Sequence, residues 1–296
     1  MSGPLRWKRE GRDWPNRQHS RFLRAGGIEW HVQEMGRGPQ LLLLHGTAAS
    51  THSFRALAPL LAPHFRLLVP DLPGHAFTQA PPGGRLSLPT MRDLVMALLA
   101  ETGFDADIAA GHSAGAAVLV RAVLDVPSFR PRCIVSLNGA LLPFEGVTGK
   151  VAPGLAQLLF LNPVAPRVFA FLAGDESVKR LVGNMGSKID RDGVRLYRTL
   201  MGNSVHVAAA LGMMASWDLD GLARDLPRLP VPLTLVTAAG DRAVPPGTAA
   251  AVKALLPSAE IVSMRGVGHL AHEEKPMAVA EILFDLARRH GAAQHG

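Results

Sequence analysis

The sequence predicts an α/β protein with a mostly parallel sheet flanked by helices, and three observations support this. Short apolar runs such as residues 39–46 recur along the chain, each bounded by turn residues. Amphipathic stretches alternate with these runs, which is typical of parallel strands joined by crossover helices. The alternation stops between residues 143 and 217 and resumes at Pro232. We therefore expect a core formed by 28–142 and 218–290, with a helical lid at 143–217 inserted into it.

Each element has its own local signal. The run at 39–46 is apolar nearly throughout, as a strand buried on both faces should be. A helix expected over 90–103 ends at a glycine. The other expected strands are 20–26 and 28–36, an opening antiparallel pair joined at Gly26 and Gly27, and 65–75, 107–113, 132–140, 232–241 and 259–266. The other expected helices are 53–63, 114–126, 247–257 and 276–290, and a tail over 291–296 follows the last of them.

The composition is that of a soluble globular protein. The 296 residues are 48% hydrophobic and 19% charged, which provides ample material for a core. Cys133 is the one cysteine, so an internal disulfide is excluded and a reducing compartment is indicated. The N-terminal stretch lacks the apolar segment of a secretory signal, and no run reaches the roughly 18 apolar residues of a membrane span. We expect a cytoplasmic protein without a membrane span.

The net charge of +7 is concentrated in two segments. Residues 1–30 hold seven Lys/Arg against three Asp/Glu, and residues 143–216 hold eight against five. A nucleic-acid-binding surface would interleave a basic stripe with aromatic side chains, but only 5% of the residues are aromatic. We interpret residues 1–27 as a basic N-terminal arm and first strand whose charge serves solubility, and we expect no nucleic-acid partner.

Ser113 is the candidate nucleophile. It lies in the pentapeptide Gly-His-Ser-Ala-Gly at 111–115, which fits G-x-S-x-G and falls between an expected strand and an expected helix. The motif requires this position because the serine sits on a strained turn, where side chains at Gly111 and Gly115 would collide with the neighbouring strand and helix. The helix N-terminus adds positive potential at the same point.

A serine hydroxyl needs a positioned base, and two later loops provide one. Asp241 follows the apolar strand at 232–241, and His269 follows the last expected strand. Both loops belong to the carboxyl edge of the sheet, so the sequence predicts a triad in which His269 takes the Ser113 proton and Asp241 orients the imidazole. The expected oxyanion hole consists of the backbone N–H groups of Ala114 and Thr47, with Ala48 as the alternative to Thr47.

Together these motifs resemble the α/β-hydrolase superfamily over roughly residues 28–290. A narrower resemblance, to the magnesium chelatase accessory proteins of bacteriochlorophyll biosynthesis, covers nearly the whole chain. The stretches that carry it are DWPNRQHSRFLRAGGIEWHVQEMG, GHSAGAAV, LNGALLPFEG, GSKID, MMASWDL and GHLAHEEKP. It implies a place in magnesium-tetrapyrrole synthesis and photosynthesis, a porphyrin as one candidate ligand, and contact with magnesium chelatase. Ala76 departs from the superfamily pattern, which usually has glycine there.

Several neighbouring polar residues have two interpretations. His112 either lines the pocket or packs behind it, and Asn138 either supports or replaces the acid. In the superfamily, His45 usually shapes the oxyanion loop, and Asp71 and His75 are more often loop organisers than catalysts.

A metal site is not expected. His269, His272, Glu273 and Glu274 match no zinc-helix spacing, and we place the two glutamates with Pro276 at the start of the last helix. Nothing in the sequence implies a cofactor.

The lid has apolar and basic candidates for ligand contacts. Met213, Met214 and Trp217 either line an apolar pocket or pack the lid core. Arg191, Arg195 and Arg198 recur at helical spacing, so they share one face. That face is either solvated or, if the ligand is a porphyrin, pairs with its propionate groups.

The sequence therefore predicts a serine hydrolase acting through an acyl-enzyme on an ester-like, apolar small molecule. Two alternatives stay open. One is a non-catalytic porphyrin-binding or magnesium chelatase accessory protein that uses the same pocket. The other is lyase or transferase chemistry on the same triad.

Overall fold

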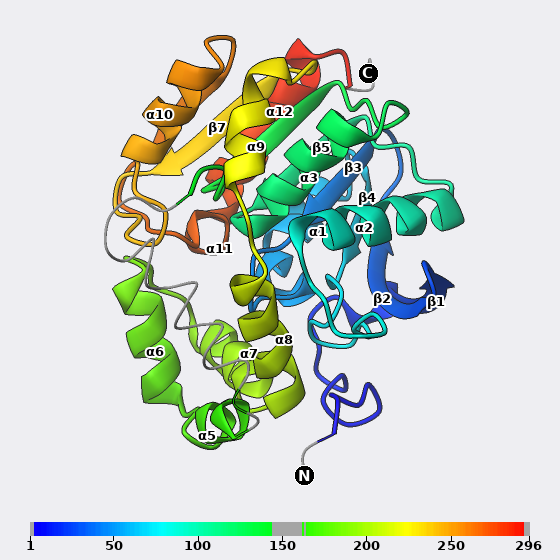
Figure 1. Ribbon diagram of the computed structural model, residues 1–296, viewed down its shortest axis with the longest axis vertical. Helices are drawn as coiled ribbons and strands as arrows, with labels where there is room; N and C mark the ends of the chain where they lie inside the picture. Colours follow the sequence, from blue (N-terminus) through cyan, green and yellow to red (C-terminus); the bar gives the residue numbers. More distant parts are fainter. Residues whose placement is uncertain (1–2, 144–161, 163, 293–296) are drawn as a thin grey trace.

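The computed structural model describes residues 3–143, 162 and 164–292, and in this part of the chain eight strands form one sheet (Figure 1). The strand order is β1-β2-β4-β3-β5-β6-β7-β8. β2 runs antiparallel to β1 and β4, and the remaining neighbours are parallel, as predicted. The strands are β1 (Ser20–Ala25), β2 (Ile28–Met35), β3 (Gln40–Leu44), β4 (Arg66–Pro70), β5 (Ile108–His112), β6 (Cys133–Leu137), β7 (Leu233–Ala238) and β8 (Glu260–Met264).

Helices follow most strands and cross over to the next. The described core helices are α1 (Leu57–Leu61), α2 (Leu88–Thr102), α3 (Ala114–Asp125), α9 (Asp220–Asp225), α10 (Gly247–Leu255), α11 (Ala271–Glu274) and α12 (Pro276–Arg289). The described lid helices are α5 (Ala165–Phe171), α6 (Asp175–Asn184), α7 (Arg191–Met201) and α8 (Ser204–Ala215). Short 3-10 helices span Arg17–His19, Thr51–Phe54 and Leu226–Arg228.

One expected helix is broken in two. The sequence pattern predicts a continuous helix over 53–63, but the stretch forms the end of the 3-10 helix Thr51–Phe54 and then α1. Ser50 caps the 3-10 turn, accepting a hydrogen bond from the His52 N–H at 3.3 Å. This tighter turn competes with a longer α-helix.

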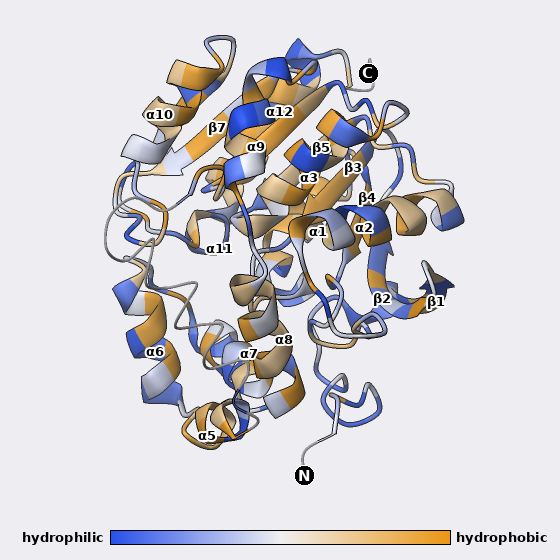
Figure 2. Ribbon diagram, in the orientation of Figure 1, coloured by the Kyte–Doolittle hydropathy of each residue, from blue (hydrophilic) through white to orange (hydrophobic). Residues whose placement is uncertain are grey.

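Two apolar layers enclose the sheet, because alternate residues of its central strands point to opposite faces. Leu42 and Leu44 of β3 pack in the layer that includes α2 and α3, whereas Leu41 and Leu43 pack with α1 and α12. Figure 2 shows the resulting apolar band along the central strands. Both faces of the central parallel strands are therefore covered, whereas the edge strand β8 is largely exposed.

The lid helices α5–α8 lie between β6 and β7 in the chain and gather beside one end of the sheet (Figure 1). The expected lid range of 143–217 includes residues 144–161 and 163, which lie outside the described residues, as do 293–296 of the expected tail. Met213 of α8 is fully buried in the core layer of α2 and α3. In the described part of the chain, no helix is long and apolar enough to cross a membrane.

The N-terminal arm packs on the core, so it has a structural role in addition to the solubility expected from its charge. The Trp14 indole N–H donates to Thr51 Oγ1 at 3.1 Å, and the Trp7 ring centroid lies 4.8 Å from that of His31. His31 Nδ1 lies 2.7 Å from Asp71 Oδ2, and its Nε2 lies 3.0 Å from Ser20 Oγ. This buried chain joins the first strand to the loop after β4.

Candidate active site

Ser113 lies on a strained turn between β5 and α3. Its backbone angles are φ 51° and ψ −117°, a conformation that costs a non-glycine residue on the order of 1–3 kcal/mol. The Ser113 N–H donates to the Leu137 carbonyl at 3.0 Å, and its own carbonyl accepts from Ala116 and Ala140 at 3.2 Å. The surrounding backbone thus fixes the turn, and the side chain keeps partial exposure.

The two glycines of the motif are required by close backbone contacts. A Cβ at Gly111 would lie 2.4 Å from the Ala116 nitrogen, and one at Gly115 would lie 2.4 Å from the Leu44 carbonyl oxygen. These neighbours are backbone atoms of α3 and β3, so they cannot rotate away. Glycine therefore lets α3 pack close to β3.

Gly115→Ala should destabilise the protein by about 1–3 kcal/mol, because the new methyl group overpacks a backbone contact. Gly247 is the matched control, since it also lies in the first turn of a helix but has no atom within 4 Å of the place that a Cβ would take. Urea unfolding of both variants measures the difference. Equal free energies of unfolding for Gly115→Ala and the wild type would contradict the packing argument.

His269 and Asp241 meet at the carboxyl edge of the sheet. His269 Nδ1 lies 2.8 Å from Asp241 Oδ2, and both side chains are buried. Because a carboxylate only accepts, Nδ1 carries the proton and Nε2 keeps its lone pair. The other carboxylate oxygen, Oδ1, accepts from the N–H groups of Ala243 and Val244 at 2.8 Å. The imidazole is therefore held in the tautomer that a general base needs.

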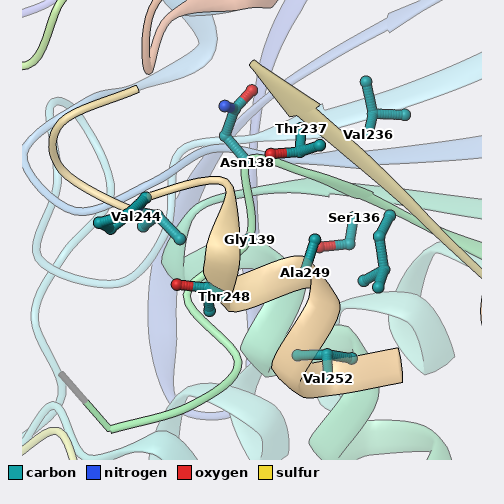
Figure 3. A pocket seen from close by; sticks show the side chains of 11 residues that line it. Ser136, Asn138, Gly139, Val236, Thr237, Val244, Thr248, Ala249 and Val252 are labelled. Carbon is teal, nitrogen blue, oxygen red and sulfur yellow. The ribbon is translucent and has the colours of Figure 1, made fainter. Parts of the chain in front are cut away.

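Asn138 supports the acid. Its backbone is left-handed, with φ 48°, and its Nδ2 donates to Asp241 Oδ2 at 2.8 Å. Asp241 Oδ2 thus accepts from both the amide and the imidazole, which fixes the carboxylate plane. Asn138 also lines a small cavity of about 20 Å³ with Thr237 and Thr248, large enough for one water molecule (Figure 3).

The base loop packs against the nucleophile turn through His112. The His112 Nε2–H donates to the His269 carbonyl at 3.0 Å, and the two ring centroids are 4.7 Å apart. Among the described residues the Ser113 hydroxyl has no hydrogen bond, and the structure brings it to the same edge without joining it to His269. Hydrogen bonds of catalytic groups are often long in the free enzyme and tighten with substrate.

His112 has the packed role of its two interpretations, so its assignment to the pocket wall is corrected. Its side chain is 2% exposed and lies between His269 and His272, whose ring centroid is 4.4 Å away. Burial lowers the pKa of His112 well below its ordinary value and that of His272 to about 3. Both rings are therefore neutral at pH 7.

Residues 45–48 and the start of α3 hold the candidate oxyanion donors. Ala114 is the first residue of α3, so its N–H has no partner within the helix. Thr47 Oγ1 lies 3.6 Å from Met213 Sδ, which places lid helix α8 against this loop. His45 has the structural role expected of it: its Nε2 accepts from Leu72 N at 2.8 Å, and burial lowers its pKa to about 3.

His206 of the lid was missed in the sequence and connects two loops. Its Nδ1 accepts from Ala76 N at 3.0 Å, so its Nε2–H donates to the Ala48 carbonyl at 3.2 Å. Ala76 and Ala48 are both left-handed, with φ 45° and 61°. The turn at Ala76 thus keeps a conformation that favours glycine. No sequence signal marks His206, which occurs in an apolar helix.

The loop organisers behave as expected around Asp71. Asp71 Oδ1 accepts from Thr51 N at 2.7 Å, and Oδ2 accepts from Phe77 N at 3.3 Å as well as from His31. Burial alone would raise the pKa of Asp71, but His31 and the hydrogen bond from the Thr51 N–H together lower it. His75 Nδ1–H donates to the Pro73 carbonyl at 3.0 Å.

Glu273 and Glu274 do not start the last helix, which corrects that prediction. α12 begins at Pro276, and the two glutamates belong to α11. Glu273 is buried, forms an ion pair with Arg55 and accepts from the Tyr197 hydroxyl at 2.8 Å; burial raises its pKa. Within the described ranges, no group of three His, Cys, Asp or Glu side chains is placed to hold a metal ion.

The remaining lid candidates divide between core and surface. Met213 is buried, Met214 is 46% exposed, and Trp217 is half-buried against the core. The α7 arginines are exposed: Arg195 lies 3.6 Å from Asp192, and Arg198 lies 3.3 Å from Asp175. The structure thus places the α7 arginines on a solvated face, and their pairing with propionates stays a prediction.

The fold and the site geometry define an α/β-hydrolase, and a model of the alpha/beta hydrolase family matches residues 41–282. The chain belongs to that family. Over 276 residues it is 38% identical to the magnesium-chelatase 30 kDa subunit of Rhodobacter capsulatus, covering 92% of this chain and 96% of that protein. It is 30% identical over 266 residues to the pimeloyl-[acyl-carrier protein] methyl ester esterase of Xanthomonas campestris pv. campestris (strain B100), covering 86% and 96%.

Solved structures share the fold at low sequence identity. An esterase from Thermogutta terrifontis superposes with a TM-score of 0.72 at 22% identity, covering 92% of this chain and 98% of that one. A hydrolase from Pseudomonas aeruginosa PA01 superposes with a TM-score of 0.73 at 21% identity, covering 90% and 97%.

Proposed function

We propose that the protein is a serine hydrolase in which Ser113, His269 and Asp241 act through an acyl-enzyme. The observation that carries this proposal is the 2.8 Å hydrogen bond between His269 Nδ1 and Asp241 Oδ2. It leaves Nε2 unprotonated at the edge of the sheet to which the strained Ser113 turn projects. Strained backbone conformations cluster at functional sites, so the costly conformation of Ser113 beside an oriented base supports a catalytic role.

The proposed reaction has two halves. His269 Nε2 takes the Ser113 proton as Oγ attacks the ester carbonyl, and the imidazolium that forms is stabilised by Asp241. The N–H groups of Ala114 and Thr47 donate to the developing oxyanion, and each such donor contributes roughly 2.7–4 kcal/mol. His269 then protonates the leaving alcohol, after which it activates water to hydrolyse the acyl-enzyme and release the acid.

The substrate that we propose is a largely apolar ester, with a magnesium-tetrapyrrole intermediate of bacteriochlorophyll synthesis as the leading class. Two relatives support this. One is named as a magnesium-chelatase subunit, and the other as an esterase that acts on a methyl ester. We further propose contact with magnesium chelatase and a cytoplasmic location.

Labelling with a fluorophosphonate probe tests the proposal. The wild-type protein should be labelled at Ser113, identified by peptide mass. Ser113→Ala should lose the label completely, because no other serine or threonine among the described residues has a positive φ. Ser20→Ala is the matched control, since the Ser20 hydroxyl is hydrogen-bonded to His31 but the residue has relaxed, extended backbone angles of φ −82° and ψ 135°. An unlabelled wild-type protein would refute the proposal.

A non-catalytic accessory role is the second candidate, and the unbonded Ser113 hydroxyl favours it. In this role the pocket binds or delivers a porphyrin, and Ser113→Ala should restore pigment synthesis in a deletion strain. Failure of that rescue by a folded variant would remove this candidate. Identification of the products by mass would separate hydrolysis from lyase or transferase chemistry.

A further inference from the structure

In the described part of the lid, a short segment that follows α6, residues 185–188, contacts the loops of the proposed triad. We propose that this segment is a positioning element that sets the relative placement of His269 and Asp241, so that the lid is part of the catalytic frame. The inference rests on the proposed function for its effect on rate, but the geometry it concerns is measurable without any reaction.

Direct hydrogen bonds connect the segment to both loops of the triad. The Met185 carbonyl accepts from the His269 N–H and from the Arg242 N–H, each at 3.3 Å. The Met185 carbonyl oxygen thus binds the backbone of His269 and that of Arg242, the residue after Asp241. The neighbouring Ser187 Oγ accepts from the Leu270 N–H at 2.8 Å and is buried.

Three glycines allow this close approach. Gly186, in the segment, is left-handed with φ 82°, and a Cβ there would lie 1.9 Å from the Gly240 carbonyl oxygen. A Cβ at Gly268 would lie 2.2 Å from the Gly186 carbonyl carbon. Gly240 precedes Asp241, and Gly268 precedes His269. Both glycines therefore lie against Gly186 of the lid. A side chain at Gly186 would therefore push the lid segment away from the loop that carries Asp241.

The two loops and the lid form a closed set of contacts. The Gly240 N–H donates to the Val267 carbonyl at 3.0 Å, which joins the acid loop to the base loop. Glu274 accepts from the Gly268 N–H at 2.8 Å and from the Lys188 N–H at 3.1 Å, which joins the base loop back to the lid. A displacement of the lid segment is therefore transmitted to the imidazole and to the carboxylate together.

The lid itself is fixed to the core by a charged cluster. Arg55 of the core lies 2.8 Å from Asp190, which caps α7, and also pairs with the buried Glu273. Tyr197 of α7 donates to Glu273 at 2.8 Å. Residues 185–188 thus lie between α6, which ends at Asn184, and α7, which is anchored to the core by this cluster.

The test compares Gly186→Ala with Gly183→Ala. Gly183 is the matched control because it lies three residues earlier, in α6, and no atom lies within 4 Å of a Cβ position there. The first readout is the low-field proton resonance of the His269 Nδ1–H···Asp241 hydrogen bond, measured by NMR at low temperature. The second readout is the rate of fluorophosphonate labelling at Ser113 as a function of pH.

Gly186→Ala should lose or shift the resonance, and its labelling should slow about 10²-fold, which is the cost of misplacing catalytic groups by about 1 Å. Gly183→Ala should match the wild type in both. A wild-type resonance and rate in Gly186→Ala would overturn the inference, as would the absence of the resonance from the wild-type protein itself. If the wild type has the resonance but is not labelled, the proposed function fails while the resonance still decides this inference.

A milder pair covers the case in which Gly186→Ala does not fold. Ser187→Ala removes only the acceptor for the Leu270 N–H, whereas Ser177→Ala removes an exposed lid hydroxyl that bonds within the start of α6. Ser187→Ala should shift the resonance and slow labelling, and Ser177→Ala should do neither. Identical results for the two serine variants would overturn the inference.

Discussion

Asp241→Asn should lower the rate of Ser113 labelling by about 10⁴-fold with the protein still folded, because the substitution selects the wrong imidazole tautomer. The amide oxygen at Oδ1 keeps the hydrogen bonds from the Ala243 and Val244 N–H groups. The amide nitrogen then replaces the oxygen that accepts from His269 Nδ1. It donates instead, so His269 moves its proton to Nε2 and can no longer act as a base.

The same substitution creates a conflict with Asn138, and this provides an internal control. In the wild type the Asn138 amide donates to Asp241 Oδ2, but in Asp241→Asn two amide nitrogens face each other. This should cost about 1–3 kcal/mol of stability. Adding Asn138→Asp supplies an acceptor and should recover that stability. The labelling rate should stay low, because the tautomer is still wrong; recovery of the rate would show that Asp241 acts by some other means.

The protein should unfold in mildly acidic solution. Burial lowers the pKa of His45, His206 and His272 to about 3, from an ordinary value of 6.5. Between these two values the unfolded chain binds a proton at each site and the folded protein does not. Stability is therefore complete above pH 6.5 and is lost as the pH falls toward 3. At pH 5 each histidine costs about 2 kcal/mol, which together is a large part of a typical unfolding free energy.

Other buried groups act in the same window. Burial also lowers the pKa of His52, His75 and His112, which adds to the acid lability. Glu273 opposes it, because burial raises the pKa of this carboxyl and the folded state then takes up a proton as the pH falls below that pKa. Six histidines outnumber this one carboxyl, so the net direction is loss of stability in acid.

His272→Phe isolates one of these contributions. The His272 ring packs against Phe54 at a centroid distance of 5.2 Å and an interplanar angle of 43°, and among the described residues neither of its nitrogens has a hydrogen-bond partner. Phenylalanine keeps the packing and removes the titration, so the loss of unfolding free energy between pH 7.5 and 5 should shrink by about 2 kcal/mol. His64→Asn, at an exposed position, is the control variant. Urea unfolding at both pH values gives the comparison, and equal losses in all three proteins would contradict the assignment.

The sequence predicts the parts of this protein that have a periodic or punctuated signal. The central strands are recognisable because burial on both faces requires continuous apolar runs such as Leu41–Leu44, and the family comparison confirms the fold. The Ser113 turn is recognisable because close backbone contacts exclude any side chain at Gly111 and Gly115. The assignment of the triad itself stays a prediction.

What the sequence does not predict depends on contacts between distant backbones. A carbonyl such as that of Met185 has the same chemistry in every residue, so its link to His269 leaves no trace in the amino-acid types. Glu273 and Glu274 resemble a helix start because acidic residues favour that position. Pro276 instead forces Lys275 out of the helical region, with φ −135° and ψ 65°, and separates the glutamates from α12.

The chain from Ser20 through His31 to Asp71 has a practical consequence for template matching. Its separations of 3.0 and 2.7 Å meet a purely geometric definition of a charge-relay trio, and the Ser113 group does not. A search that ranks sites by interatomic spacing would therefore select Ser20 and not Ser113, the nucleophile that we propose. Backbone torsion angles distinguish the two serines, since Ser20 has extended angles (φ −82°, ψ 135°) and Ser113 has strained ones (φ 51°, ψ −117°).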